Sequence, residues 1–186
     1  MKKWNLVIDV AKCFNCNCCT LACHDEYFDN EFPGYASGMP KHGQNWISIT
    51  QRETGTVPMV EVSYLPTTCN HCDNPPCLAA ARDGAVVKRD DGIVIIVPEK
   101  ARGQRQIVDA CPYGAVHWNE ERQLPQAWPF DAHLIDKGWK RTRGAQACPT
   151  RAMRVLHVED DEMKRIVAEE GLEVLHPEYG TAPRVY

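Results

Sequence analysis

The sequence predicts an α+β fold in which short strands and helices surround cysteine-rich loops. Two observations support this class: the secondary-structure signals between the cysteines are short, and ten of the 186 residues are cysteines. Five cysteines lie within residues 13–23, three lie within 69–77, and the last two each precede a proline. Four sulfurs within residues 13–19 are too close together for a disulfide framework, which spreads its partners through the fold. The cysteines therefore predict a metal or cluster framework.

Short apolar runs predict the strands. These runs lie at residues 4–10, 46–50, 57–64 and 153–158. The third strand is expected to begin after a turn at Thr54-Gly55. Residues 85–88 and 93–97 flank a loop that contains Gly92, and this pattern predicts a β-hairpin.

Short helices are expected at residues 104–110 and just before Cys148, because the prolines after Cys111 and Cys148 oppose helix continuation. A clearer helix is predicted at residues 160–170, with an apolar face, an acidic start and Gly171 at its end. Residues 172–186 form an extended tail rich in helix-breaking residues. Such a tail lies either along its own domain or on a partner.

Composition excludes several classes of function. The 21 basic and 25 acidic residues give a net charge of -4, which argues against a nucleic-acid or anionic-membrane partner. The longest aliphatic run, residues 93–97, is far shorter than the roughly 20 residues of a membrane span, and Asp9 interrupts any apolar export signal. We expect a cytoplasmic protein. No catalytic residue is expected, because Asp9, Glu26 and Asp73 lack the pairing of a nucleophile with a base.

The cysteine spacing is typical of iron–sulfur ligands. Cys13, Cys16 and Cys19 are separated by two residues each, so one tight loop can direct three thiolates at a cubane. A second loop supplies three more, and two solitary Cys-Pro pairs supply the missing fourth ligands. These further cysteines are Cys69, Cys72 and Cys77 in the loop and Cys111 and Cys148 in the pairs. Eight ligands predict two 4Fe-4S clusters.

Zinc is the alternative metal, with His24, His71 or His117 as possible extra ligands. Zinc sites are usually built from two C-x-x-C or C-x-x-H pairs, and this does not explain three-sulfur loops that are completed by Cys-Pro singles. Cys18 and Cys23 are left over, and we expect them to be buried or free thiols.

With these motifs the chain resembles the iron–sulfur subunits that carry electrons for molybdopterin oxidoreductases of the dimethyl sulfoxide reductase superfamily. The resemblance implies two interleaved ferredoxin-like lobes in residues 1–158, followed by a helix and a partner-contacting tail in residues 159–186. It also implies how the ligands are shared. One cluster would be held by Cys13, Cys16, Cys19 and Cys148, and the other by Cys69, Cys72, Cys77 and Cys111.

The chain departs from this family in a regular way, because the family carries four clusters. A third cluster would need a cysteine near Ala81 and three more in residues 99–106, and all are absent. The fourth would use Cys23 with three cysteines that are replaced here. The replacing residues are Trp128, Asp131 and Gly144. Two cluster sites are therefore expected to be kept whole and two lost whole. Arg151 also stands where relatives tend to have glycine, which is a departure at the turn after Cys148.

Within the family the chain is similar to the small subunits of pyrogallol–phloroglucinol transhydroxylases and resorcinol hydroxylases. The likeness covers nearly the whole chain and rests on segments such as VIDVAKC, TCNHCDNPPC, DGIVIIVPEKARG, DACPYGAVHWNEE and EEGLEVLHPEYGTAPRVY. It implies a non-catalytic electron-transfer subunit that pairs with a large subunit in a heterodimer or larger complex. The large subunit would hold molybdopterin and act on hydroxylated aromatic compounds. Two alternatives stay open: a free-standing diffusing ferredoxin, and a structural subunit whose clusters only stabilise the fold.

Overall fold

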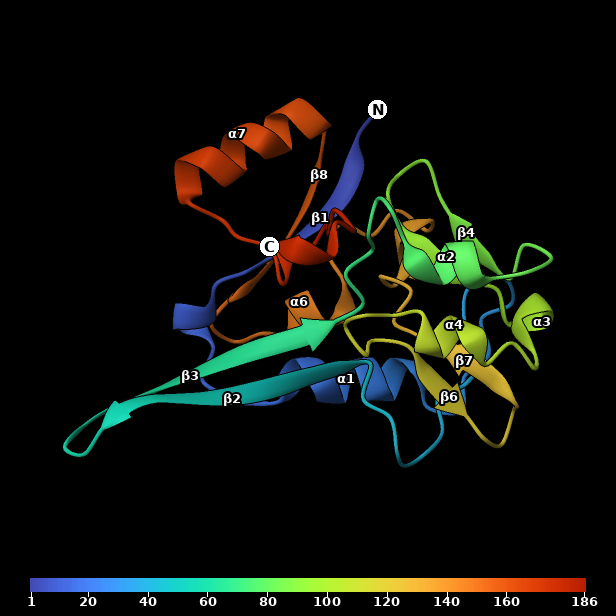
Figure 1. The fold of residues 1–186 in the computed structure, drawn as a ribbon, viewed down its shortest axis with the longest axis horizontal. Helices are drawn as coiled ribbons and strands as arrows, with labels where there is room; N and C mark the ends of the chain where they lie inside the picture. Colours follow the sequence, from blue (N-terminus) through green and yellow to red (C-terminus); the bar gives the residue numbers. More distant parts are fainter.

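Four two-stranded antiparallel sheets make up the β structure of the computed structural model, which describes residues 1–186 (Figure 1). The pairs are β1 (Lys3–Ile8) with β8 (Met153–Val158), β2 (Ile47–Thr56) with β3 (Met59–Thr68), β4 (Val86–Lys88) with β5 (Val94–Ile96), and β6 (His117–Asn119) with β7 (Leu124–Gln126). The β1–β8 pair joins segments from the two ends of the sequence, with Leu6 opposite Val155. The fold is therefore a mixed α and β fold made of small sheets.

Seven α-helices connect and cover these sheets, and most of them are a single turn. They are α1 (Cys18–Tyr27), α2 (Pro76–Ala80), α3 (Pro98–Ala101), α4 (Gln106–Asp109), α5 (Ala132–Ile135), α6 (Arg143–Ala147) and α7 (Asp160–Glu170), with 3-10 turns η1 (Val10–Lys12) and η2 (Pro177–Tyr179). None of the helices combines the length and the apolar character that a membrane crossing requires.

Local patterns predicted several elements correctly. The strands expected near both ends correspond to β1 and β8, and the expected hairpin corresponds to β4 and β5. The predicted helix at 160–170 is α7, which ends where Gly171 adopts a φ of 63°. The helices α4 and α6 precede Cys111 and Cys148 as expected.

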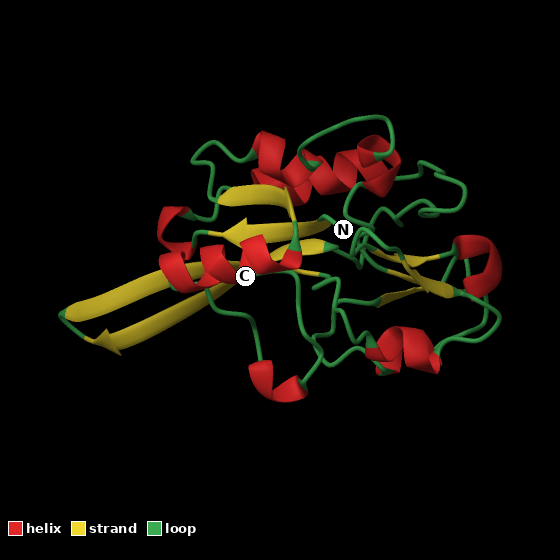
Figure 2. Ribbon diagram, turned by 90° about the horizontal axis from the view of Figure 1, so that it is seen from above, coloured by secondary structure: helices red, strands yellow, loops and turns green.

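The turn predicted at Thr54-Gly55 is wrong. Strand β2 continues through Gly55 to Thr56, and the chain turns at Val57-Pro58, so Thr56 pairs with Met59. Pro58 cannot donate a hydrogen bond to the strand ladder, which favours the turn at this point. Gly55 is needed for another reason: its φ is 89°, and a Cβ there would lie 2.2 Å from the Met59 carbonyl oxygen. The long ribbon formed by β2 and β3 projects from the rest of the molecule (Figure 2).

Two hydrophobic cores lie inside the fold. The larger contains 18 buried residues, including Cys19 and Cys23 of α1, and it gathers side chains from β1, β2 and the segment around Trp128. The smaller contains seven buried residues from β4, β5 and their surroundings, with Cys77 and Cys111 packed against it. Each of the two expected cysteine sets thus has members in or against a different core. The interleaving of two lobes in the sequence stays a prediction.

The last six residues of the tail lie on their own chain. Val185 pairs in parallel with Leu6, and the Ile8 amide donates to the Tyr186 carbonyl at 2.8 Å. The guanidinium of Arg184 is buried and forms an ion pair with Asp160, the first residue of α7. Residues 181–186 therefore lie along their own domain, and the partner contact expected for residues 172–186 stays a prediction. The division of the chain at residue 158 stays a prediction.

Candidate iron–sulfur sites

The first cysteine loop runs from η1 into α1 and is shaped by two asparagines. Asn15 and Asn17 have φ values of 61° and 58°, in the left-handed region that asparagine tolerates better than most residues. The Asn17 side chain donates to the Asn15 carbonyl at 3.0 Å. These two backbone reversals bend the loop tightly before Cys18 begins the helix.

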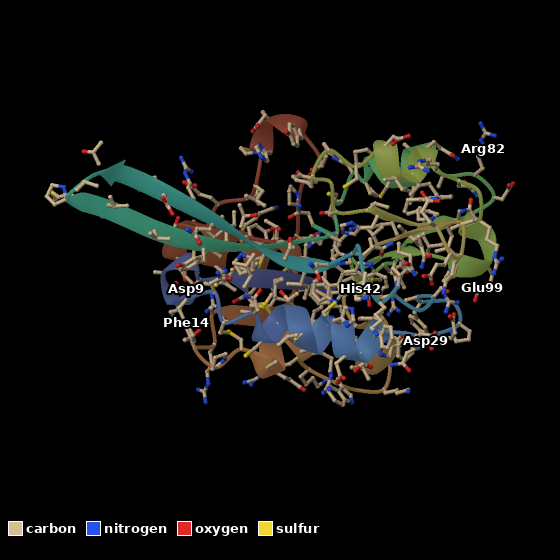
Figure 3. The ribbon with its side chains drawn as sticks, turned by 90° about the horizontal axis from the view of Figure 1, so that it is seen from below. Asp9, Phe14, Asp29, His42, Arg82 and Glu99 are labelled. Carbon is tan, nitrogen blue, oxygen red and sulfur yellow. The ribbon has the colours of Figure 1, made fainter.

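One small cavity brings together the three cysteines of this loop and the last Cys-Pro cysteine. The cysteines that line it are Cys13, Cys16, Cys19 and Cys148. The other lining residues are Phe14, Ile49 of β2, Pro66 of β3, Thr150, Ala152 and Met153. Sulfur atoms are visible beside the labelled Phe14 (Figure 3). The structure thus places Cys148 next to the first loop, far from it in sequence.

Cys148 is held at the end of α6 by several hydrogen bonds. The Ala152 amide donates to the Cys148 sulfur at 3.2 Å, and the Thr150 hydroxyl lies 3.6 Å from it. Burial would raise the pKa of the Cys148 thiol, but the Thr150 hydroxyl and the neighbouring backbone N–H groups outweigh burial and lower that pKa. These donors stabilise the thiolate, which is the form that binds metal. They meet the sulfur because Arg151 turns the chain with a φ of 56°.

The second set of cysteines lies around β4, α2 and α4. Pro75 and Pro76 direct the chain into α2, which carries Cys77. Burial and then the nearby Cys111 and Cys72 thiols raise the pKa of Cys77 to about 11. Burial is likewise the first cause of the raised pKa of Cys69, followed by its three neighbours Cys77, Cys111 and Cys72. The four thiols therefore lie close enough together to repel each other as thiolates.

His71 orients this second loop and is not placed as a zinc ligand. The Val94 amide donates to its Nδ1 at 3.1 Å, so the proton of the neutral ring is on Nε2. Burial, and then the charge of Lys88, lower the pKa of His71 to about 3, which keeps the ring neutral. The ring meets Trp128 and Phe130 edge-on, with centroids 5.6 and 5.1 Å apart. Its contacts connect the cysteine loop to the larger core.

Neither cysteine set is arranged around a single point, and no three His, Cys, Asp or Glu side chains converge as ligands of one metal ion. Four thiolates around one zinc stand roughly 3.8 Å apart, because each lies about 2.3 Å from the metal. In a cubane each thiolate binds its own iron, so the sulfurs stand further apart. Buried donors beside the loops also lack partners within the protein, namely the Asn70 amide and the Thr20 hydroxyl. Thiolates or inorganic sulfide would accept from such groups, so these residues fit a cluster.

Cys18 and Cys23 lie outside both sets. A hydrogen bond to the Cys16 thiol raises the pKa of Cys18, which places it beside the first cavity without lining it. Cys23 is fully buried, and burial raises its pKa well above the usual value. Cys23 also lies near the carboxyl group of Asp131, which raises that pKa further.

A buried carboxylate occupies the region where the fourth cluster of the family was expected to be lost. Asp131 is 1 % exposed and accepts three hydrogen bonds. Its donors are the Tyr27 hydroxyl at 2.7 Å, the Trp128 indole at 2.9 Å and the Arg143 amide at 2.6 Å. Burial raises the pKa of Asp131, although these donors oppose the shift. Sequence reasoning identified Asp131 only as a replaced cysteine and missed its role as a hydrogen-bond acceptor, for which the sequence carries no local pattern.

Glutamine side chains occupy the region where the third cluster was expected to be lost. The Arg82 amide donates to Gln104 Oε1 at 2.8 Å, and Gln104 Nε2 donates to the Lys100 carbonyl at 2.9 Å. Gln106 Nε2 contacts the Ala80 carbonyl at 3.5 Å. Hydrogen bonds therefore join the two segments, residues 80–82 and 100–106, in which the missing cysteines were expected.

The three carboxylates considered as acid or base groups are all ion-paired. Asp9 pairs with Lys12, Asp73 pairs with Arg184 and Lys88, and Glu26 pairs with Arg143 and lies 2.8 Å from His133. Each pair links two segments of the chain or caps a turn.

Comparison with known proteins agrees with this geometry. A family described as a 4Fe-4S dicluster domain matches residues 60–158. The small subunit of pyrogallol hydroxytransferase from Pelobacter acidigallici is 47% identical over 189 aligned residues, which cover 100% of this chain and 68% of the relative. A tetrathionate reductase subunit from Salmonella typhimurium is 32% identical, covering 99% of this chain and 71% of the relative. The beta subunit of dimethylsulfide dehydrogenase from Rhodovulum sulfidophilum is 38% identical over 79% of this chain and 46% of the relative.

Proposed function

Because the chain belongs to the 4Fe-4S dicluster family of iron–sulfur subunits, we propose that it is the electron-transfer partner of a molybdopterin catalytic subunit. It holds two 4Fe-4S clusters in this proposal. The catalytic subunit acts on hydroxylated aromatic compounds, as a hydroxylase or transhydroxylase. Support for the aromatic substrate comes from the likeness to the pyrogallol hydroxytransferase small subunit over the full length of this chain.

The first cluster is proposed to bind to the cysteines of the first loop and to Cys148. Their shared cavity supports this assignment, since all four cysteines line it. The second cluster is proposed to bind to the other loop and to Cys111, which is supported by the nearby Cys111 thiol raising the pKa values of Cys69 and Cys77 after burial. The full sets are Cys13, Cys16, Cys19 and Cys148, and Cys69, Cys72, Cys77 and Cys111.

When bound, such a cluster accepts and releases single electrons. The residues of this chain hold the thiolates and adjust the environment of the cluster. The Ala152 amide and the Thr150 hydroxyl contact Cys148. N–H···S contacts of this kind favour the more negative, reduced state and so raise the reduction potential. Burial of the second set acts in the opposite direction, because a low dielectric disfavours added charge.

The single observation that carries the proposal is that Cys148 and the three cysteines of the first loop line the same cavity. The test is a purified native complex with measured iron, sulfide, molybdenum and pterin. We expect about eight iron and eight sulfide per copy of this chain. Addition of the aromatic substrate, followed by rapid freezing and electron paramagnetic resonance, should show both clusters changing redox state within one turnover. Clusters that never change state would favour a purely structural role, and purification as a free monomer would favour a diffusing ferredoxin.

A further inference from the structure

We propose that the ribbon formed by β2 and β3 is a docking arm, and that its apolar face binds the catalytic subunit at the rim of the first cysteine cavity. This inference rests on the proposed function, since it identifies the surface that the proposed partner covers. It differs from the sequence-based expectation, which assigned the partner contact to residues 172–186.

The two faces of the ribbon differ in chemistry. Residues directly opposite each other in an antiparallel pair share a face, and the faces alternate along each strand. One face carries Ile49 opposite Pro66, and further out it carries Tyr64, Val62 and Val60 of β3 opposite Gln51, Glu53 and Gly55 of β2. The other face carries mostly hydroxyl and charged side chains, namely Ser48, Thr50, Arg52, Thr54, Thr56, Thr67, Ser63 and Glu61, together with Leu65 and Met59. The first face, called the apolar face here, therefore carries a row of apolar side chains along β3, whereas the second face is mostly polar.

Only the inner end of the apolar face is covered by this chain. Ile47 is buried in the larger core and Ile49 packs against that core. Every residue from 50 to 63 is exposed, and Val60 and Val62 are 46 and 45 % exposed. At the tip, Val57 and Met59 are 89 and 80 % exposed. A two-stranded ribbon with a bare apolar face is marginally stable in water by itself, which indicates that another surface covers it.

The apolar face begins at the first cysteine cavity. Ile49 and Pro66 belong to this face and also line the cavity that contains Cys148. Phe14, on the cysteine loop itself, is 56 % exposed, and Val10 of the neighbouring η1 is 44 % exposed. A protein that binds the arm therefore also covers the rim of the cavity. In this position a redox centre of the partner could exchange electrons with the first cluster.

The catalytic subunit fits this surface better than a second copy of the chain. A stable interface uses about 20–30 residues on each side, and the exposed arm supplies residues 50–63 before the cavity rim is added. A second copy would bring only the same two clusters to the cavity, and it would neither supply nor consume electrons. The catalytic subunit is the partner whose reaction needs an electron carrier at this point.

The test compares two double variants that change the charge equally on opposite faces of the arm. Val60→Lys/Val62→Lys places two ammonium groups on the apolar face, and Thr54→Lys/Ser63→Lys places two on the hydroxyl face. Each full-length tagged chain is expressed in its native host and purified. Molybdenum, pterin and iron are measured in the purified material, together with the affinity for the separated catalytic subunit.

We expect both variants to retain about eight iron. The apolar-face variant should lose affinity for the molybdenum-containing subunit by about 100-fold or more, because two ammonium groups would replace apolar contacts and only the one at position 62 lies opposite a carboxylate, that of Glu53. The hydroxyl-face variant should bind within about threefold of the unsubstituted chain, as surface substitutions usually do.

Equal binding by the two variants would overturn the docking arm and leave the proposed function intact. Dissociation of a dimer of this chain by the apolar-face variant, with the catalytic subunit still bound, would assign the arm to a second copy instead. A purified native chain with no molybdenum-containing subunit would overturn both proposals, while the iron content would still report on the clusters.

Discussion

The guanidinium of Arg184 forms a two-pronged ion pair with Asp73, the residue that follows Cys72. Arg184 Nε donates to Asp73 Oδ1 at 2.7 Å and Nη2 donates to Oδ2 at 2.5 Å. The Arg184 side chain is 4 % exposed, and its other contacts are with Asn5 and Asp160. The end of the chain is thereby tied to the second cysteine loop, to β1 and to α7.

Replacement of Arg184 by Met should destabilise the fold by about 2–3 kcal/mol, because Asp73 and Asp160 lose a buried cationic partner. The cost stays below that of a fully buried pair, because water still reaches both carboxylates. For a chain of this size the thermal midpoint should fall by roughly 5–10 °C. The midpoint can be followed through the visible absorbance of the clusters. The control is Arg165→Met, which removes only an exposed pair with Glu162 and should change the midpoint by less than about 2 °C. Equal midpoints for the two variants would contradict a structural role for Arg184.

The same ion pair predicts a dependence on pH. Burial alone would raise the pKa of Asp73, but Arg184 and Lys88 outweigh it, so the pKa is lowered in the folded state. The stabilisation from Asp73 is therefore present above the unfolded pKa of about 3.9 and is lost as the pH falls through the lower, folded value. The unsubstituted chain should lose stability below about pH 4 more steeply than the Arg184→Met variant. Parallel profiles for the two chains between pH 2 and 6 would show that the pairing of Asp73 with Arg184 contributes nothing to the pH dependence.

Asp131 should be replaceable without loss of iron but not without loss of stability. Asp131→Leu leaves the Tyr27 hydroxyl, the Trp128 indole and the Arg143 amide unpaired in the core. We expect a cost of about 3–5 kcal/mol, since each unpaired buried donor costs about 1–3 kcal/mol. Asp131→Asn keeps a carbonyl acceptor and should cost less than half as much. Iron content and thermal midpoint are measured together, and a loss of four iron in either variant would contradict this role.

The pairing of distant cysteines can be tested by substitution. Cys148→Ala and Cys16→Ala should abolish the same electron paramagnetic resonance signal, whereas Cys111→Ala and Cys72→Ala should abolish the other. Each variant should retain about four iron, because a cubane that lacks one thiolate is lost as a unit. Cys18→Ala is the control and should keep both signals, since Cys18 does not line the cavity. If Cys148→Ala removed the signal of the second loop, the proposed ligand sets would be wrong.

Replacement of Arg151 by glycine should stabilise the fold. Its φ of 56° costs a side-chain-bearing residue about 1–2 kcal/mol, and the greater chain entropy of glycine offsets part of the gain. We expect a net stabilisation of about 0.5–1 kcal/mol, seen as a higher thermal midpoint. Arg154→Gly, in the extended strand β8, should lower the midpoint instead. A lower midpoint for Arg151→Gly would show that the Arg151 side chain makes contacts that outweigh its backbone strain.

The sequence by itself determined the parts of this protein that depend on neighbouring residues. Helix α7 follows from its apolar spacing and Gly171, and β4 and β5 follow from two short apolar runs around a glycine loop. The two cysteine loops also follow from spacing, because thiolates a few residues apart can converge without help from the rest of the fold. The family was identifiable for the same reason, since its motifs are local.

Only the tertiary structure decided the features that join distant segments. Contacts between distant parts of the chain determine three of these features: the β1–β8 pair, the position of Cys148 beside the first loop, and the buried position of the Arg184 side chain. The turn in the ribbon was mispredicted because Gly55 serves a close approach to Met59 and not a reversal of the chain. Asp131 became a buried acceptor because folding surrounds it with three donors from separate elements. Such contacts depend on the packing of the whole chain, so short-range residue patterns cannot predict them.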